Sequence, residues 1–185
     1  MELNKEELVI LVNQDDSPVG VMEKMEVHRR GLLHRAVSVF IFNSRGEWLL
    51  QRRAKTKYHS NSLWTNTCCS HPYPDETNSN AATRRLMQEM GMNAQLVEIF
   101  DFVYHEMLDN ELIEHELDHV FVGVTDHQPV INTDEVMEFK YVTYDDLLCQ
   151  IANSPEQFTC WFKKIVNEVF VHFTKSNIEY ETDNN

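Results

Sequence analysis

Segments with strand character and segments with helix character follow one another irregularly along this chain, and that order most constrains its fold. AVSVFIF (36–42) is rich in β-branched and aromatic residues, and the turn NSRG (43–46) separates it from EWLLQRR (47–53). These three segments predict a β-hairpin. The regular alternation of strand and helix that a parallel sheet requires is absent. The sequence therefore predicts an α/β domain in which a mixed β-sheet lies between helices.

Other strands and helices are predicted on both sides of this hairpin. A first hairpin is expected around the turn-rich NQDDSP, which LVILV precedes and VGVMEK follows. The further predicted strands are 98–108, 119–125 and 138–144. Two helices, 145–154 and 155–173, follow the last strand, and Pro155 suits the first turn of the second. Residues 54–78 are expected to form a loop.

The segment SNAATRRLMQEMGM, which follows that loop, predicts a helix of about a dozen residues. Ser79 or Asn80 can cap its start, and Gly91 can end it. Its apolar stripe consists of Ala82, Leu86 and Met90. Arg85 and Glu89 lie one turn apart beside this stripe, where a side chain can reach a buried ligand. We therefore expect these two residues at a site, rather than Arg84 or Gln88, since Arg84 points nearly the other way.

Basic and acidic residues are unevenly distributed along the chain. The net charge of −14 argues against nucleic acid and anionic membrane surfaces as partners, because both are polyanions. Residues 24–85, however, contain 11 of the 16 Lys and Arg but only four of the 30 acidic residues, a net charge of +7. The remainder carries −21. A cationic segment in an acidic protein predicts a small anionic ligand, because the remainder would repel a polyanion.

At 185 residues the chain can bury a core large enough for one domain. We place this domain at 1–175 and expect the polar, acidic tail 176–185 to be disordered. The sequence lacks an apolar run of about 18 residues, and MELNKEELVI lacks a basic region ahead of an apolar stretch. We therefore expect neither a membrane span nor a signal peptide. Four unevenly spaced cysteines predict thiols in the cytoplasm, with Cys149 and Cys160 as small hydrophobic residues.

The heptapeptide NTCCSHP could hold a metal, carry a reactive thiol or fill the core. It is not a zinc knuckle, because no second Cys or His pair follows at the required spacing. His28 and His34 flank RRGLL, and Glu114 and Glu116 form an E-x-E on a stretch predicted to be extended, where residues i and i+2 share a face. With His71, they would form a nitrogen and oxygen site for Mn²⁺, Zn²⁺ or Mg²⁺. Only folding can bring the three segments together.

The other histidines carry no such pattern. We expect them at the surface of strands, loops or helices: His59, His105, His115, His119, His127 and His172.

Four stretches resemble type I isopentenyl diphosphate isomerase, a family on the Nudix fold: HRRGLLHRAVSVFIFN, LLQRRAKTKYHSNSLWTNTCCSHP, ELIEHELDHVF and CWF. The resemblance extends from Leu8 to about Phe173. The LWTN-x-x-C-x-HP and E-x-E blocks are specific to this family within the Nudix superfamily. The resemblance implies interconversion of isopentenyl and dimethylallyl diphosphate by protonation and deprotonation, in isoprenoid biosynthesis. The partner would be a small isoprenoid diphosphate, and we expect a cytoplasmic monomer or weak dimer.

The resemblance also implies roles for individual residues. The implied catalytic residues are the thiol Cys69, the opposing acid Glu116, its assistant Tyr104 and the aromatic wall Trp161. Those implied to bind the diphosphate are Lys24, Arg53, Lys57 and Arg85. The implied ligands of one divalent metal are His28, His34, His71, Glu114 and Glu116. A Mg²⁺ bridged to the diphosphate would take Glu89 and the backbone carbonyl of Cys69.

One departure separates this chain from the hydrolases of the same superfamily. The hydrolase box G-x5-E-x7-R-E-U-x-E-E-x-G-U, with U aliphatic, maps onto Ser70, Glu76, Arg84, Arg85, Leu86, Gln88, Glu89, Gly91 and Met92. Here Ser70 replaces the first glycine, and Arg85 and Gln88 replace two glutamates. The loss of two carboxylates removes metal ligands that phosphoryl hydrolysis needs. We therefore expect the diphosphate to stay intact; the alternatives are a hydrolase of nucleoside diphosphate derivatives and a binding module without turnover.

Overall fold

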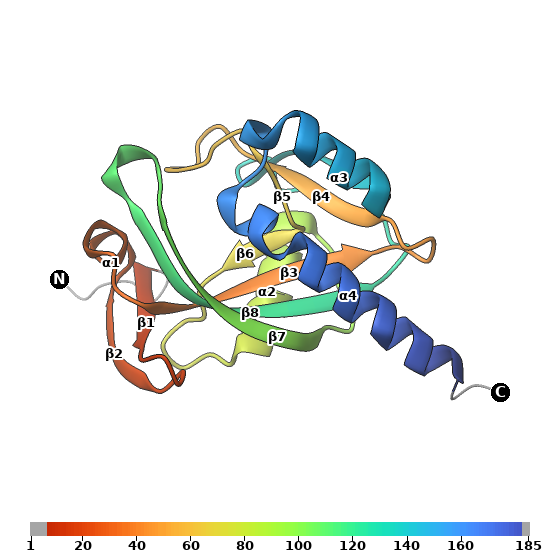
Figure 1. The fold of residues 1–185 in the computed structure, drawn as a ribbon. Helices are drawn as coiled ribbons and strands as arrows, with labels where there is room; N and C mark the ends of the chain where they lie inside the picture. The colour runs from red at the N-terminus through yellow and green to blue at the C-terminus, as the bar shows by residue number, and fades with distance from the viewer. Residues whose placement is uncertain (1–6, 183–185) are drawn as a thin grey trace.

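The computed structural model describes the backbone of residues 7–182 and the side chains of residues 7–175. Its described part contains a nine-stranded mixed β-sheet with helices on both faces (Figure 1), which confirms the predicted fold class. The strands are β1 (Leu8–Val12), β2 (Pro18–Glu23), β3 (His34–Phe42), β4 (Trp48–Arg53), β5 (Trp64–Thr65), β6 (Cys68–Ser70), β7 (Val97–Met107), β8 (Ile113–Val124) and β9 (Val136–Val142). The α-helices are α1 (Lys24–Arg30), α2 (Asn78–Met90), α3 (Tyr144–Asn153) and α4 (Cys160–Thr182). None of the described helices is long and apolar enough to span a membrane.

Strand β3 organises the sheet. It pairs parallel with β8, and it pairs antiparallel with β1 at its start, with β6 in its middle and with β4 at its end. Strand β7 pairs antiparallel with the other side of β8. In this register His34 of β3 lies opposite Glu116 of β8, and Tyr104 of β7 lies opposite the same glutamate. Three residues implied in the site therefore share one row across three strands.

Alternate residues of β3 pack into two different cores. Phe40 and Phe42 belong to the core beneath α3 and α4, whereas Val39 and Ile41 belong to the core beneath α2. Side chains alternate between the faces of a strand, so a continuous apolar segment can be buried on both sides. The helices thus cover opposite faces of the sheet, as Figure 1 shows for α2 and α4.

Helix α2 ends where the sequence predicts but begins earlier. The side chain of Thr77 caps it by accepting from the backbone N–H of Asn80, so neither Ser79 nor Asn80 is the cap. Gly91 ends the helix at φ 61°. A Cβ there would lie 2.5 Å from the carbonyl oxygen of Val130, so the site requires glycine for space as well as for conformation. This contact docks the connection to β9 against α2.

Several elements differ from the prediction. Helix α1 is not predicted; Glu23 caps it and Gly31 ends it at φ 61°. Strands β5 and β6 lie inside the predicted loop 54–78. The last helix begins at Cys160 rather than Pro155, because Phe158 forms a parallel bridge with Trp64 and keeps the chain extended.

Helix α4 also continues beyond the predicted domain boundary at 175, to Thr182, so the backbone of the first part of the predicted tail is helical. Residues 183–185 lie outside the described residues.

Candidate active site and metal centre

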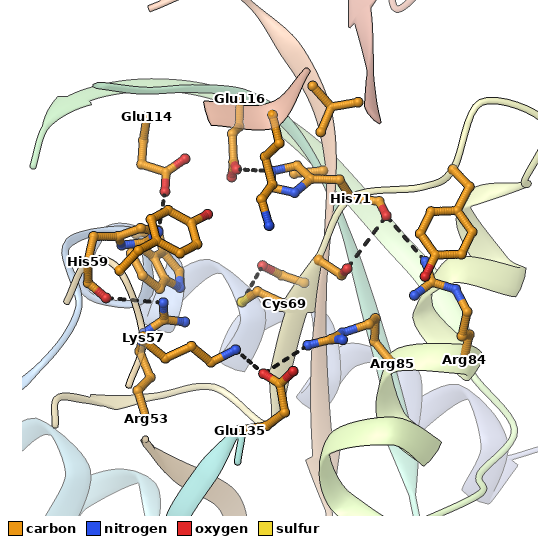
Figure 2. A pocket seen from close by; sticks show the side chains of 18 of the residues that line it. Arg53, Lys57, His59, Cys69, His71, Arg84, Arg85, Glu114, Glu116 and Glu135 are labelled. Carbon is orange, nitrogen blue, oxygen red and sulfur yellow. Dashed lines mark hydrogen bonds and ion pairs between the residues drawn. The ribbon is translucent and has the colours of Figure 1, made fainter. Parts of the chain in front are cut away.

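A cavity of about 220 Å³ gathers most of the residues that the sequence analysis singles out (Figure 2). Ten of them line it: Lys24, Arg53, Lys57, Cys69, His71, Arg85, Tyr104, Glu114, Glu116 and Trp161. The other three, His28, His34 and Glu89, are buried and are not among its lining residues. Segments far apart in sequence therefore meet at one site.

Strand β6 places the Cys69 thiol opposite a serine of β3. Ser38 and Cys69 are paired across the two strands, with the hydroxyl oxygen 3.4 Å from the sulfur. The Ser38 hydroxyl donates to Asp118 Oδ2 at 2.7 Å. Burial and then the charge of Asp118 raise the pKa of the Cys69 thiol to about 12, although hydrogen bonds with Ser38 and Asn66 oppose the shift. The sulfur therefore holds its proton at neutral pH.

The neighbouring Cys68 points the other way. Its side chain is fully buried in the core beneath α2, because successive residues of a strand face opposite sides. Only the second cysteine of the heptapeptide is therefore among the cavity-lining residues.

Asn66 connects the thiol to the indole of Trp161. Its amide nitrogen donates to the Cys69 sulfur at 3.0 Å, and its amide oxygen accepts from Trp161 Nε1 at 3.3 Å. The same amide nitrogen also donates to the carbonyl oxygens of Val39 and Cys68. These bonds fix the orientation of the amide. One side chain thus sets the position of both the sulfur and the aromatic wall.

Glu116 is held as a carboxylate within a hydrogen-bonded group. His71 Nε2 lies 2.9 Å from its Oε1, and the Tyr104 hydroxyl donates to its Oε2 at 2.5 Å. Burial alone would raise the pKa of Glu116, but hydrogen bonds from His34 and His71 lower it well below the ordinary value. A proton acceptor and the Cys69 proton donor therefore line the same cavity.

Glu116 and three histidine side chains together can hold a metal ion. The potential ligand atoms of His28, His34, His71 and Glu116 all lie within 4.8 Å of one another. Nδ1 of His28 donates to the Lys24 carbonyl oxygen at 2.7 Å, and Nδ1 of His34 donates to that of Leu32 at 2.9 Å. These bonds keep a proton on each Nδ1, so Nε2, including the one that His34 directs at Glu116, is the nitrogen that would give up its proton when a cation binds.

The surroundings of Glu114 also fit a cation. Its Oε2 lies 3.4 Å from His28 Nε2, and both atoms are buried without a hydrogen-bond partner within the described part of the chain. Burial and then the charge of Glu116 raise the pKa of Glu114 well above its ordinary value. Buried polar atoms without partners are costly, and a divalent cation would satisfy both. The donor set therefore fits a metal centre.

The other end of the cavity is cationic. Burial, and then the charges of Lys57 and Arg85, lower the pKa of Lys24, so these side chains share one positive environment. Lys57 and Arg85 both pair with Glu135, the last residue of the connection to β9 that docks against α2. Sequence reasoning missed Glu135, because nothing in its local pattern marks it. Figure 2 shows Lys57 and Arg85 converging on Glu135, so positive charge is concentrated here, as a site for the predicted anionic ligand requires.

The flank of α2 is only partly as expected. Arg85 reaches the cavity and pairs with Glu89, whose carboxylate also accepts from Gln51 Nε2 at 2.6 Å. Arg84 reaches the cavity too, contrary to the prediction that it points away. Its guanidinium pairs with Glu76 at 2.8 Å and is therefore already partnered. Of the two arginines, Arg85 lies nearer to the other cations.

Two of the histidines expected at the surface are buried. His119 lies between Asp16 and Glu98, at 3.2 and 2.6 Å, and does not line the cavity. His59 lines the cavity, and only 4% of the residue is exposed. The aperiodic loop that carries His59 gave no signal that its chain turns inward.

Known proteins resemble this chain over most of its length. The NUDIX domain family matches residues 32–162. The isopentenyl-diphosphate Delta-isomerase of Pectobacterium atrosepticum is 54% identical over 84% of this chain and 87% of the relative. Isopentenyl-diphosphate Delta-isomerase 2 of Photorhabdus laumondii is 49% identical over 88% of this chain and 92% of the relative.

Solved structures show the same fold at lower identity. The DR0079 protein from Deinococcus radiodurans has a TM-score of 0.75 and 20% identity, over 88% of this chain and 98% of that one. A MutT protein from Methanosarcina mazei has a TM-score of 0.62 and 18% identity, over 78% of this chain and 95% of that one. At these identities the likeness concerns the fold alone.

Proposed function

We propose, from the premise that this chain belongs to the isopentenyl-diphosphate Delta-isomerases of the NUDIX family, that its cavity is where the double bond moves. The observation that carries this proposal is that Cys69 and Glu116, from different strands, line one cavity. Moving a double bond by one carbon requires that one carbon gains a proton and that another, two atoms away, loses one. Two acid or base groups must therefore face the substrate, and these residues supply one each.

The tryptophan at the cavity wall suits the charge that develops. Protonation of the terminal alkene carbon leaves a tertiary cation at the neighbouring carbon. Loss of a proton from the next carbon, on the diphosphate side of the cation, then forms the new double bond. The face of an indole stabilises a cation without a nucleophile that would trap it. Trp161 is buried, lines the cavity and is anchored by Asn66. We therefore assign it the stabilisation of this intermediate.

We assign the cationic end to the diphosphate. The proposed binding residues are Lys24, Arg53, Lys57 and Arg85, all of which line the cavity. Burial alone would lower the pKa of Arg85, but Glu89 and Glu135 raise it above its ordinary value, so the guanidinium stays charged. Binding energy from this remote group positions the five-carbon chain between the sulfur and the carboxylate.

Two metal ions complete the proposal. His28, His34, His71, Glu114 and Glu116 would hold one divalent cation, Mn²⁺, Zn²⁺ or Mg²⁺, and Glu89 with the Cys69 carbonyl would hold Mg²⁺ beside the diphosphate. When bound, the first supplies charge that orients Glu116 and changes its proton affinity, and the second neutralises the diphosphate. The buried, unpartnered Nε2 of His28 and Oε2 of Glu114 support the first site.

Hydrolysis is disfavoured by the residues of α2. Arg85 lies where the hydrolase box has a carboxylate, and it pairs with Glu89. A cation at that position binds phosphate and cannot gather the metal ions that activate water for hydrolysis. A binding module without turnover is also disfavoured, because both acid–base groups line the cavity.

The enzyme with Mg²⁺ should interconvert isopentenyl and dimethylallyl diphosphate. In heavy water, deuterium should enter the product at the carbons that exchange protons, which mass spectrometry measures. Release of phosphate or diphosphate without isomerisation would instead support a hydrolase. Tight binding of the substrate with neither reaction would support the binding module.

Ser38→Ala should lower kcat by about fivefold, since a net hydrogen bond of about 1 kcal/mol to the reacting thiol is lost. The KM for isopentenyl diphosphate should change little, because Ser38 contacts the sulfur and Asp118 rather than the cationic end. Steady-state kinetics separate the two constants. An increase in KM at constant kcat would show that the hydroxyl serves substrate binding.

We also propose that the enzyme works in the cytoplasm, as a monomer or weak dimer. All four cysteines are free thiols, as a reducing compartment requires. The net charge of −14 favours a soluble chain with weak self-association.

A further inference from the structure

His59 is buried at the metal end of the cavity, although it belongs to the loop between β4 and β5. Its ring packs edge-on against Tyr58 and Trp161, with centroid distances of 4.5 and 5.9 Å. Arg53 donates to the His59 carbonyl oxygen at 3.3 Å, which ties the loop to β4. The following Ser60 has φ 47°, a left-handed conformation that residues other than glycine seldom adopt. The fold thus holds this imidazole inward.

The imidazole faces one oxygen of Glu114. His59 Nε2 lies 3.3 Å from Glu114 Oε1, the contact drawn in Figure 2. His59 Nδ1 lies 3.2 Å from the Ser60 hydroxyl. With a cation bound, the Glu114 carboxylate is ionised and can only accept hydrogen bonds, so the proton sits on His59 Nε2 and the Ser60 hydroxyl donates to Nδ1. Both ring nitrogens are then satisfied.

The two oxygens of Glu114 therefore have different surroundings. Oε1 faces His59, whereas Oε2 faces His28 Nε2 at 3.4 Å and has no hydrogen-bond partner within the described residues. A hydrogen bond to one oxygen of a carboxylate fixes the orientation of the whole group. The other oxygen then faces a cation in a constant direction. Hydrogen bonds of this kind orient metal ligands, and their loss typically weakens metal binding about 10- to 100-fold.

We infer that His59 is a positioning residue of the metal centre: it donates from Nε2 to Glu114 Oε1 and so directs Oε2 toward the cation shared with His28. This inference rests on the metal centre of the proposed function. It adds a fourth histidine, which contributes a hydrogen bond rather than a metal–nitrogen bond. Because the same ring packs on Trp161, it also links the metal centre to the wall beside the reacting carbons.

Two substitutions separate the hydrogen bond from the packing of the ring. His59→Phe keeps a flat ring and removes the donor, whereas His59→Gln removes the ring and keeps an N–H donor at a similar reach. The full-length chain, stripped of metal, would be titrated with Zn²⁺ against a chromogenic chelator. We expect the dissociation constant to rise about 10- to 100-fold for His59→Phe. For His59→Gln it should stay close to the wild-type value.

The outcomes distinguish the possible failures. Wild-type affinity in His59→Phe would overturn the inference and leave the metal centre standing. Equal losses in both variants would also overturn it, because the ring itself, through packing or direct ligation, would then be what matters. A wild-type chain that takes up no divalent cation would overturn the proposed metal centre as well. Thermal unfolding of the metal-free variants controls for folding, and His59→Ala replaces the phenylalanine variant if that one unfolds.

Discussion

Replacing Cys69 by alanine should lower kcat for isomerisation by about a hundred- to ten-thousand-fold, the range that loss of a general acid or base produces. The thiol lines the cavity and holds its proton, and alanine has no proton to transfer. The fold should persist, because the Ser38 to Asp118 hydrogen bond and the bonds of Asn66 to the backbone do not involve the sulfur. Steady-state turnover and deuterium incorporation measure the effect.

Cys68→Ala is the matched control for this substitution. It removes the same thiol group from the adjacent residue, but that side chain is buried beneath α2, away from the cavity. We expect near-normal turnover and a loss of about 0.5–3 kcal/mol in the free energy of unfolding, as for other truncations in a core. If Cys68→Ala abolished turnover while Cys69→Ala preserved it, the thiol would be assigned to the wrong cysteine.

Glu116→Gln should lower kcat over a similar range, about a hundred- to ten-thousand-fold. The amide has nearly the shape of the carboxylate, and its oxygen can still accept from Tyr104, but it cannot take up a proton from carbon. Glu106→Gln is the matched control, because Glu106 lies on β7 and pairs with Lys164 outside the cavity. It should leave kcat unchanged.

The metal content of the Glu116→Gln variant decides how the loss arises. If activity returned with excess Mn²⁺ or Zn²⁺, Glu116 would serve as a ligand alone. If the metal site were filled and turnover still failed, the carboxylate itself would carry the proton. Elemental analysis of the dialysed protein, measured beside kinetics at saturating metal, separates these results.

Periodic parts of the sequence predicted structure well. The apolar stripe and Gly91 located α2 and its end, and the stripe selected Arg85 and Glu89 as candidate site residues. The stripe and the cap are both visible in the sequence because they depend only on residues close together in the chain. The E-x-E pattern correctly placed Glu114 and Glu116 on one strand, both buried. Local pattern was sufficient at these positions.

Other parts depend on contacts between distant segments. Strands β5 and β6 are only two and three residues long, too short to show a period, and α1 has seven residues. His59 turns inward through contacts with Tyr58, Trp161 and Glu114, none of which its own loop encodes as a pattern. Glu135 is likewise recognisable only once its loop meets Lys57 and Arg85. The roles of the site residues came from family resemblance rather than from periodicity.

The shared row of His34, Glu116 and Tyr104 limits how the chain can vary in length. Removing one residue from β8 ahead of the glutamate would turn its side chain to the opposite face of the sheet, because side chains alternate along a strand. The metal ligand and the proton acceptor would then be lost together. Insertions and deletions in relatives should therefore collect in the short connection between β7 and β8, and the paired strands should keep a constant number of residues.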